Sequence, residues 1–202
     1  MRHGARRPPG PPKQFDTQRT LERARDLFWR RGFDGTGLSE LEGELGVGRK
    51  SLYDTFGNKR ALYLASLAHY GDSVIAAICD GLERPGASPL ANLERVLGKL
   101  ARHHASGESH GCLLGVGLAQ VQRDDAEIVA ALRRELARLE DAFERTLQRA
   151  LDAGELRPNV RPRDSARQLV AFVQGMALLG RIADSPAVLP TAMSATLDGL
   201  RR

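Results

Sequence analysis

The chain has 202 residues, of which 42% are hydrophobic and 27% charged, and its formal net charge is +5. This length is enough for a small domain and a second domain with its own core. Two cysteines argue against a disulfide scaffold, and no run approaches about 18 uncharged apolar residues, so we expect a cytoplasmic protein without a membrane span.

The first segment, residues 1–16, is rich in Pro, Gly and Arg, and Phe15 is its one bulky apolar side chain apart from Met1. A secretory signal needs an apolar core segment, which is missing here. We interpret residues 1–16 as a flexible basic arm.

Residues 38–56 have the pattern of a helix-turn-helix. Leu38, Leu41 and Leu45 recur at i, i+3 and i+7, which predicts a short helix with one apolar face. Gly46 ends this helix, because the residue after a helix often has to tolerate positive φ. Two short helices joined by a tight turn allow the second one to enter the major groove of DNA.

The second helix of this pair carries polar side chains on one face. Leu52 and Phe56 are four residues apart and are expected to face the first helix. Lys59 and Arg60 begin a further helix, whose N-terminal N–H groups also favour a phosphate. The alternative is a helical hairpin in an ordinary bundle with solvated basic residues. The outward side chains are of the types that contact phosphates and base edges, namely Arg49, Lys50, Ser51, Tyr53, Asp54 and Thr55.

This part of the chain resembles the TetR/AcrR family of transcriptional regulators. The resemblance runs from Thr20 to about Leu64 and is carried by Leu52-Tyr53, Phe56 and the segment Asn58-Lys59-Arg60-Ala61-Leu62. It implies that the DNA contacts are made by Arg49, Lys50, Ser51, Tyr53, Thr55 and Lys59, and Thr36 is added to this set.

Three positions depart from the family pattern. Gly37 and Gly48 stand where the family usually has Ser or Thr to cap the two helices, and Glu42 stands where a small Ala is usual. Replacing such a cap by Gly costs a few tenths of a kcal/mol. We expect these departures to affect which operator is recognised rather than whether DNA is bound.

Positive charge is concentrated at the N-terminal end. Residues 1–60 contain 13 Lys/Arg and 8 Asp/Glu, whereas residues 61–202 contain 17 of each. This distribution is expected if the first part meets phosphates and the rest does not. Two interpretations of the arm stay open: it lies along DNA and raises the affinity in a salt-dependent way, or it has no measurable effect.

The rest of the chain has a helical pattern, and runs with the period of two that strands need are missing. We expect helices near 58–83, 88–105, 111–122, 124–153, 163–184 and 187–201, which gives an all-α fold. The expected organisation is the arm at 1–16, a helix-turn-helix DNA-binding domain at 17–63, and a helical regulatory and dimerisation domain at 64–202.

Residues 166–180 predict a dimer interface. The segment is nearly uncharged after Arg167 and rich in small residues, so a partner is expected to cover its second face. Dimers are also usual for helix-turn-helix proteins, which bind two half-sites. The resemblance implies a four-helix interface at roughly 163–201, and the alternative is a helix central to its own domain. The candidate contacts are Leu169, Phe172, Val173, Met176 and Leu179.

The resemblance further implies a small-molecule effector that binds the C-terminal domain and releases the operator. The candidate pocket residues are mostly aliphatic or aromatic, and any helical core contains the same types. No cofactor or metal site is expected, because His103 and His104 are adjacent and point to different sides of a helix. The pocket candidates are Leu67, Tyr70, Cys112, Leu113, Val116, Phe143, Phe172 and Met176.

Cys112 suggests a second mode of regulation. It follows His110-Gly111 at the expected first turn of a helix, where the helix dipole and the histidine would favour a reactive thiolate. A redox- or electrophile-sensing regulator is therefore one hypothesis, and a small packing cysteine is the other.

Motifs of common enzymes are missing from the sequence: it has no G-x-S-x-G elbow, no H-E-x-x-H and no Gly-rich phosphate loop after a strand. Together with the helix-turn-helix pattern, the resemblance implies a homodimeric repressor that binds a palindromic operator and responds to a small molecule. A DNA-binding protein of low specificity is the alternative, and Asp54 on the outward face argues weakly against it.

Overall fold

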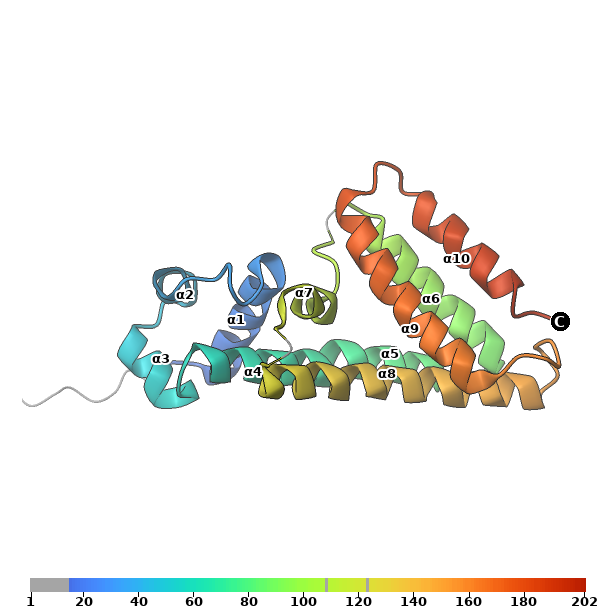
Figure 1. Cartoon of the computed structure of the whole chain (residues 1–202), viewed down its shortest axis with the longest axis horizontal. Coiled ribbons are helices and arrows are strands. Elements are labelled where there is room, and N and C mark those ends of the chain that lie inside the picture. The colour runs from blue at the N-terminus through green and yellow to red at the C-terminus, as the bar shows by residue number, and fades with distance from the viewer. Residues whose placement is uncertain (1–14, 108, 123) are drawn as a thin grey trace, which may run out of the picture.

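The computed structural model describes residues 15–107, 109–122 and 124–202, and these ranges form helices and turns without a β-strand. The all-α prediction is confirmed. Figure 1 shows a small head at one end, two long helical stretches running from the head along the base, and further helices above them at the C-terminal end. Residues 1–14 of the predicted arm (1–16) lie outside the described residues.

The head consists of α1 (Thr17–Arg31), α2 (Leu38–Leu45) and α3 (Arg49–Phe56). Asp16 belongs to this head and not to an arm, because its carboxylate accepts a hydrogen bond from the Arg19 backbone N–H and caps α1. The helix-turn-helix prediction is confirmed. Gly46 ends α2 in the left-handed region, at φ 66°, and turns the chain towards α3.

The head docks on α4 (Lys59–Tyr70) through buried aromatic rings. The ring of Tyr63 lies 5.1 Å from that of Phe28 and 5.1 Å from that of Phe33, measured between centroids. Asn58 caps α4 by accepting a hydrogen bond from the Ala61 N–H. Large buried rings contribute strongly to packing energy, so this cluster sets how the head sits on α4.

The α4 helix continues without a loop through the π-helical turn η1 (Gly71–Ile75) into α5 (Ala76–Leu82). The predicted domain boundary after residue 63 falls within this helix, so the head and the body share it. By length and composition, Lys59–Leu82 could also cross a membrane. Leu62, Leu67 and Ile75 are at most 1% exposed, which is the burial expected of a core helix.

The body is completed by α6 (Pro89–His104), α7 (Leu113–Gln120), α8 (Ala126–Asp152), α9 (Pro162–Leu179), the 3-10 turn η2 (Gly180–Ile182) and α10 (Val188–Asp198). These helices agree with the predicted ranges to within a few residues, except that α9 ends earlier and gives way to η2. The long α8 packs against α4, α5, α6 and α9, while α10 packs on α6. One side of α8 faces the core, with Ile128, Leu132 and Phe143 at most 4% exposed.

A buried carboxylate joins α8 to the η1 turn. Glu135 is 2% exposed, and its two oxygens lie 2.9 Å from Arg134 Nε and 2.8 Å from Arg138 Nη1. Arg138 also lies 3.5 Å from Asp72 in η1. A buried charge needs such partners, because an unpaired one is strongly destabilising.

The end of α6 contains a histidine that is buried in the neutral form. His104 is 4% exposed, and its Nδ1 lies 3.0 Å from Ser109 Oγ. Burial, together with the smaller effect of the neighbouring His103, lowers the pKa of His104 from 6.5 to about 4.

We expect acidification to destabilise the protein through His104. Between pH 6.5 and 4 the unfolded chain binds a proton at this residue and the folded chain does not, so stability falls with pH. At about 1.4 kcal/mol per pKa unit, the loss from pH 7.5 to 5.0 is at most about 2 kcal/mol. Thermal unfolding should show a smaller acid-induced loss for His104→Gln than for the wild type. The control His103→Gln, at an exposed neighbour, should keep most of the loss; equal losses for wild type and His104→Gln would contradict the prediction.

Candidate nucleic-acid interface

The α3 helix presents most of the predicted contact residues on the outside of the head. Arg49, Lys50 and Thr55 are exposed, and Ser51 and Tyr53 are partly exposed. On the opposite face Leu52 is 1% exposed, as predicted. In Figure 1 α3 lies at the end of the molecule that is far from α9 and α10. The structure therefore brings these five side chains together on one accessible helix.

Both cations at the start of α3 are paired with acidic groups of the head. Lys50 Nζ lies 2.7 Å from Asp54 Oδ2, one turn further along α3. Arg49 Nη2 lies 3.3 Å from Glu42 Oε2 on α2. Exposed ion pairs of this kind contribute about 0–1 kcal/mol. A DNA phosphate or base edge can therefore replace them at low cost.

Glu42 also caps α3 from the preceding helix. Gly48 is the N-cap residue and has no side chain to offer, but the Glu42 carboxylate accepts a hydrogen bond from the Arg49 backbone N–H at 2.7 Å. The two departures at Glu42 and Gly48 thus compensate each other. The sequence analysis did not predict this capping role of Glu42. The feature that could have indicated it is an acidic residue on α2 combined with a glycine at the N-cap of α3.

Thr36 is removed from the candidate contacts. Its side chain is 0% exposed, and its hydroxyl donates a hydrogen bond to the Gly32 carbonyl at 2.6 Å. This carbonyl lies at the C-terminal end of α1, where helix carbonyls lack partners within the helix. The hydroxyl therefore completes the end of α1 and has no surface left for DNA.

Two basic residues at the start of α4 have different surroundings. Lys59 Nζ lies 4.4 Å from the centroid of the Phe33 ring, a cation–π contact that holds it in place. Burial lowers the pKa of Lys59, and Asp34 opposes this effect. Arg60 forms an ion pair with Asp125, just before α8, and so ties α4 to the body.

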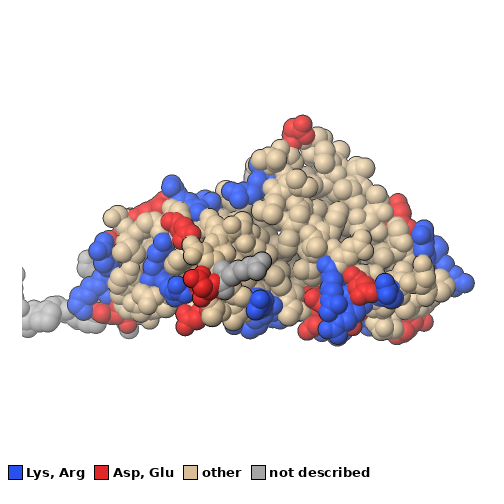
Figure 2. Space-filling model, viewed as in Figure 1, with Lys and Arg blue, Asp and Glu red and all other residues tan. Residues whose placement is uncertain are grey.

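The described part of the N-terminal region is nearly neutral. Residues 15–60 contain nine Lys/Arg and eight Asp/Glu, and the remaining four cations of the N-terminal region are at positions 2, 6, 7 and 13. Figure 2 shows basic and acidic side chains interspersed over the head. Of the net charge of +5 that the sequence assigns to residues 1–60, +4 therefore belongs to residues 1–14.

Comparisons with known proteins agree with this geometry. The model for bacterial regulatory proteins of the tetR family matches residues 21–66, and the model for the tetracyclin repressor-like C-terminal domain matches residues 89–196. This chain belongs to the TetR family. It is accordingly a DNA-binding transcriptional regulator with an N-terminal helix-turn-helix.

Relatives of this TetR-family chain are regulators as well. The uncharacterized HTH-type transcriptional regulator YezE of Bacillus subtilis is 35% identical, over 71% of this chain and 74% of its own length. The transcriptional repressor ComR of Escherichia coli is 28% identical, over 85% of this chain and 82% of its own length. A cysteine-substituted form of the TetR-family regulator CifR, solved with 26-bp operator DNA, superposes with a TM-score of 0.83 at 22% identity and covers 95% of this chain and 100% of that one.

The predicted effector-pocket residues are packed into the core of this TetR-family body. Leu67, Leu113 and Phe143 are 0% exposed, and Val116 and Met176 are at most 5% exposed. Phe172 is partly buried and packs against the same core. The structure therefore shows these side chains as core residues, and their role in binding an effector stays a prediction.

Cys112 is the N-cap residue of α7 and is 7% exposed. Its Sγ lies 3.4 Å from the hydroxyl of Tyr70. Burial is the main cause that raises the pKa of Tyr70 well above its ordinary value. The side chain of His110 is exposed. The thiol thus lies in a buried contact with α4 instead of at an open helix terminus.

The predicted dimer contacts divide into two groups. Leu169, Val173 and Met176 are at most 3% exposed, because this stripe of α9 packs against the chain's own core. They are not available to a partner, and the prediction is wrong for these three. Phe172 is partly exposed and Leu179 is 59% exposed. The sequence indicated an apolar helix, but the periodicity alone did not show which face the body covers.

We expect Glu42→Ala to strengthen binding to random duplex DNA by about three-fold or more, because it frees the Arg49 guanidinium and removes a negative charge near the phosphates. The same change removes the α3 cap and should lower stability by about 0.5–1 kcal/mol. Fluorescence anisotropy and thermal unfolding measure the two effects.

The matched control is Glu44→Ala, which removes the same charge from α2 but leaves the Arg49 contacts intact, since Glu44 lies 3.7 Å from Arg30. Glu42→Gln keeps an acceptor at the cap and should retain more stability than Glu42→Ala. An equal gain in affinity from Glu44→Ala would show that only net charge matters, against the prediction.

Proposed function

We propose that this TetR-family regulator is a repressor that binds a palindromic operator as a homodimer and releases it when a small-molecule effector binds. The observation that carries the proposal is the exposed polar face of α3, held at the far end of a head that shares the α4–α5 helix with the body. ComR, a relative over most of the chain, is a repressor.

The proposed DNA contacts are five residues of α3 and one of α4. Arg49 and Lys50 bind guanine edges or phosphates after giving up their acidic partners. The Thr55 hydroxyl donates to the Ser51 carbonyl, which leaves its oxygen as an acceptor. Lys59 binds a phosphate near the N-terminus of α4. The set is Arg49, Lys50, Ser51, Tyr53, Thr55 and Lys59.

A homodimer would cover the large apolar side chains at the C-terminal end. Leu178 is 42% exposed, Leu179 59%, Ile182 82% and Val188 51%. They lie on α9, on η2 and at the start of α10, in the lobe that is mostly uncharged in the view of Figure 2. Exposed apolar residues that cluster in this way mark interaction surfaces. We propose that Phe172 and these four residues form the interface.

The effector would act through α7, which contacts α1, α4, α8 and α9. Just before α7, the Gly111 carbonyl accepts a hydrogen bond from Trp29 Nε1 of the head at 3.1 Å. A ligand that enters among Tyr70, Cys112 and Val116 would displace α7 and disturb this contact. Release requires that the ligand bind the DNA-incompetent arrangement more tightly.

A second candidate is regulation through oxidation or alkylation of Cys112. The observation in its favour is that Cys112 directly follows Gly111 and contacts Tyr70. A group added to Cys112 would therefore strain the hydrogen bond between Trp29 of the head and the Gly111 carbonyl. Full operator binding by protein that is quantitatively alkylated at Cys112 would remove this candidate.

The test of operator binding uses a duplex from the DNA flanking the protein's own coding region, compared with a scrambled duplex by fluorescence anisotropy across salt concentrations. We expect tighter binding to the flanking DNA, and a loss of about 1–3 kcal/mol for Lys50→Ala. The control is Arg145→Ala on α8, which removes the same charge far from α3. Equal and steeply salt-dependent binding to both duplexes would favour a DNA-binding protein of low specificity.

We expect light scattering at micromolar concentration to give twice the 22.0 kDa chain mass. The pair Leu179→Asp and Ile182→Asp should convert the dimer to a monomer, because a charge in an apolar interface is costly. Leu118→Asp on α7 introduces the same side chain at a leucine that is 42% exposed, and should leave the dimer intact. A monomeric wild-type protein would refute the proposed interface.

A further inference from the structure

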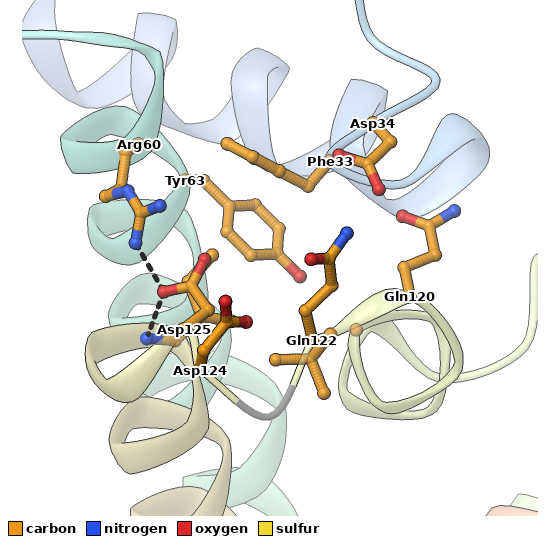
Figure 3. Close-up of a pocket in the computed structure, with 11 residues that line it drawn as sticks. Phe33, Asp34, Arg60, Tyr63, Gln120, Gln122, Asp124 and Asp125 are labelled. Carbon is orange, nitrogen blue, oxygen red and sulfur yellow. Dashed lines mark hydrogen bonds and ion pairs between the residues drawn. The ribbon is translucent and has the colours of Figure 1, made fainter.

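A cavity of about 310 Å³ lies at the junction between the head and the body (Figure 3). The head contributes Phe33 and Asp34, which follow α1, and α4 contributes Arg60 and Tyr63. The opposite wall comes from the end of α7, from Val121, Gln122, Asp124 and Asp125 between the helices, and from Ile128 of α8. The cavity is therefore formed by both parts of the molecule, and it lies apart from the apolar residues predicted to bind an effector.

Two buried polar atoms at this cavity have no hydrogen-bond partner among the described residues. Tyr63 is 1% exposed, and its hydroxyl is unpaired. The Oε1 atom of Gln120 is also buried and unpaired. Figure 3 shows both side chains reaching into the space between head and body. A buried polar group without a partner costs about 1–3 kcal/mol, and a bound ligand is one way to recover this cost.

Two glycines allow these groups to take their positions. A Cβ atom at Gly117 would lie 2.8 Å from the Tyr63 hydroxyl oxygen. A Cβ atom at Gly32, where φ is 75°, would lie 2.1 Å from the amide of Gln120. Any larger residue at either position would displace the polar group. The two unpaired atoms are thus held close to backbone that leaves room for them.

The charge of the lining selects the ligand class. Asp34, Asp124 and Asp125 contribute three carboxylates and Arg60 one guanidinium, which is paired with Asp125. With the Lys59 ammonium over the neighbouring Phe33 ring, the formal charge at the cavity is −1. Burial, and then Asp34 and Asp125, raises the pKa of Tyr63 to about 12, so its hydroxyl stays protonated and neutral. Such a site attracts cations and repels anions.

The remaining lining is partly apolar and also includes the amide of Gln122. The Phe33 ring, Val121 and Ile128 line the cavity beside the polar groups. A ligand that matches the whole lining therefore carries a positive donor at one end and a short hydrocarbon segment at the other. Hydrogen-bond donors on the cation would satisfy the Tyr63 oxygen and Gln120 Oε1.

We propose that this junction cavity binds a small organic cation, a protonated primary amine that carries a short apolar segment. The ammonium group donates to the Tyr63 oxygen and to Gln120 Oε1, and the carboxylates of Asp34 and Asp124 balance its charge. Asp34 belongs to the head and Asp124 to the body, so the bound amine links the two parts. Its effect on DNA affinity rests on the proposed function, whereas binding of the amine does not.

The test is isothermal titration of the full-length protein with benzylamine and 1,4-diaminobutane at fixed ionic strength. Benzyl alcohol and butane-1,4-diol are the neutral probes of matched size. We expect saturable binding of at least one amine at one site per chain, and no binding of the alcohols. Tyr63→Phe keeps the ring and Asp34→Asn replaces an exposed carboxylate; each should weaken binding at least ten-fold.

The control variant is Asp141→Asn, which removes an exposed carboxylate of α8 outside the cavity and should leave the affinity unchanged. Absence of amine binding, equal binding of amines and alcohols, or an equal loss in the control would overturn the proposal. Operator binding is measured separately without amine, so a failure of the proposed function can be distinguished from a failure of the amine site. Amine binding that leaves operator affinity unchanged would support the site and overturn its coupling to DNA.

Discussion

The packing of α1 on α4 is the interaction on which the rest of this structure depends. Phe28 and Phe33 pack against the ring of Tyr63, and these contacts fix the head on the first turns of a helix that continues into the body. Because η1 continues α4 into α5 without a loop, the helix on which the head packs runs directly into the body. In the proposed function, a change in the body would reach α3 through these packed side chains.

The α7 helix provides a second connection between the same two parts. At its start the Gly111 carbonyl accepts the Trp29 hydrogen bond, and at its end Gln120 lies against Gly32. The proposed apolar effector site is lined by Tyr70, Cys112 and Val116, beside α7. The proposed amine site lies at the C-terminal end of α7. Both would act on α1, so two chemically different ligands could alter the position of α3 through one set of contacts.

The outward face of α3 combines basic residues with acidic partners. Glu42 and Asp54 hold Arg49 and Lys50 in defined positions before DNA is bound, at little cost in stability. Because the described head is nearly neutral, long-range attraction to phosphates would depend on the cations of residues 1–14. If the arm contacts DNA as one interpretation has it, this arrangement would separate the attraction to DNA, through the arm, from the proposed selection of a sequence by α3.

The sequence by itself determined the features that depend on neighbouring residues. The spacing of Leu38, Leu41 and Leu45 and the glycine at 46 identified the helix-turn-helix, because helical periodicity and turn conformation are local properties. Only the tertiary structure decided that Thr36 is buried and that Glu42 caps α3, since both depend on contacts between helices. It also decided which face of α9 the body covers. The junction cavity combines segments distant in sequence, and a one-dimensional pattern does not contain the distances between them.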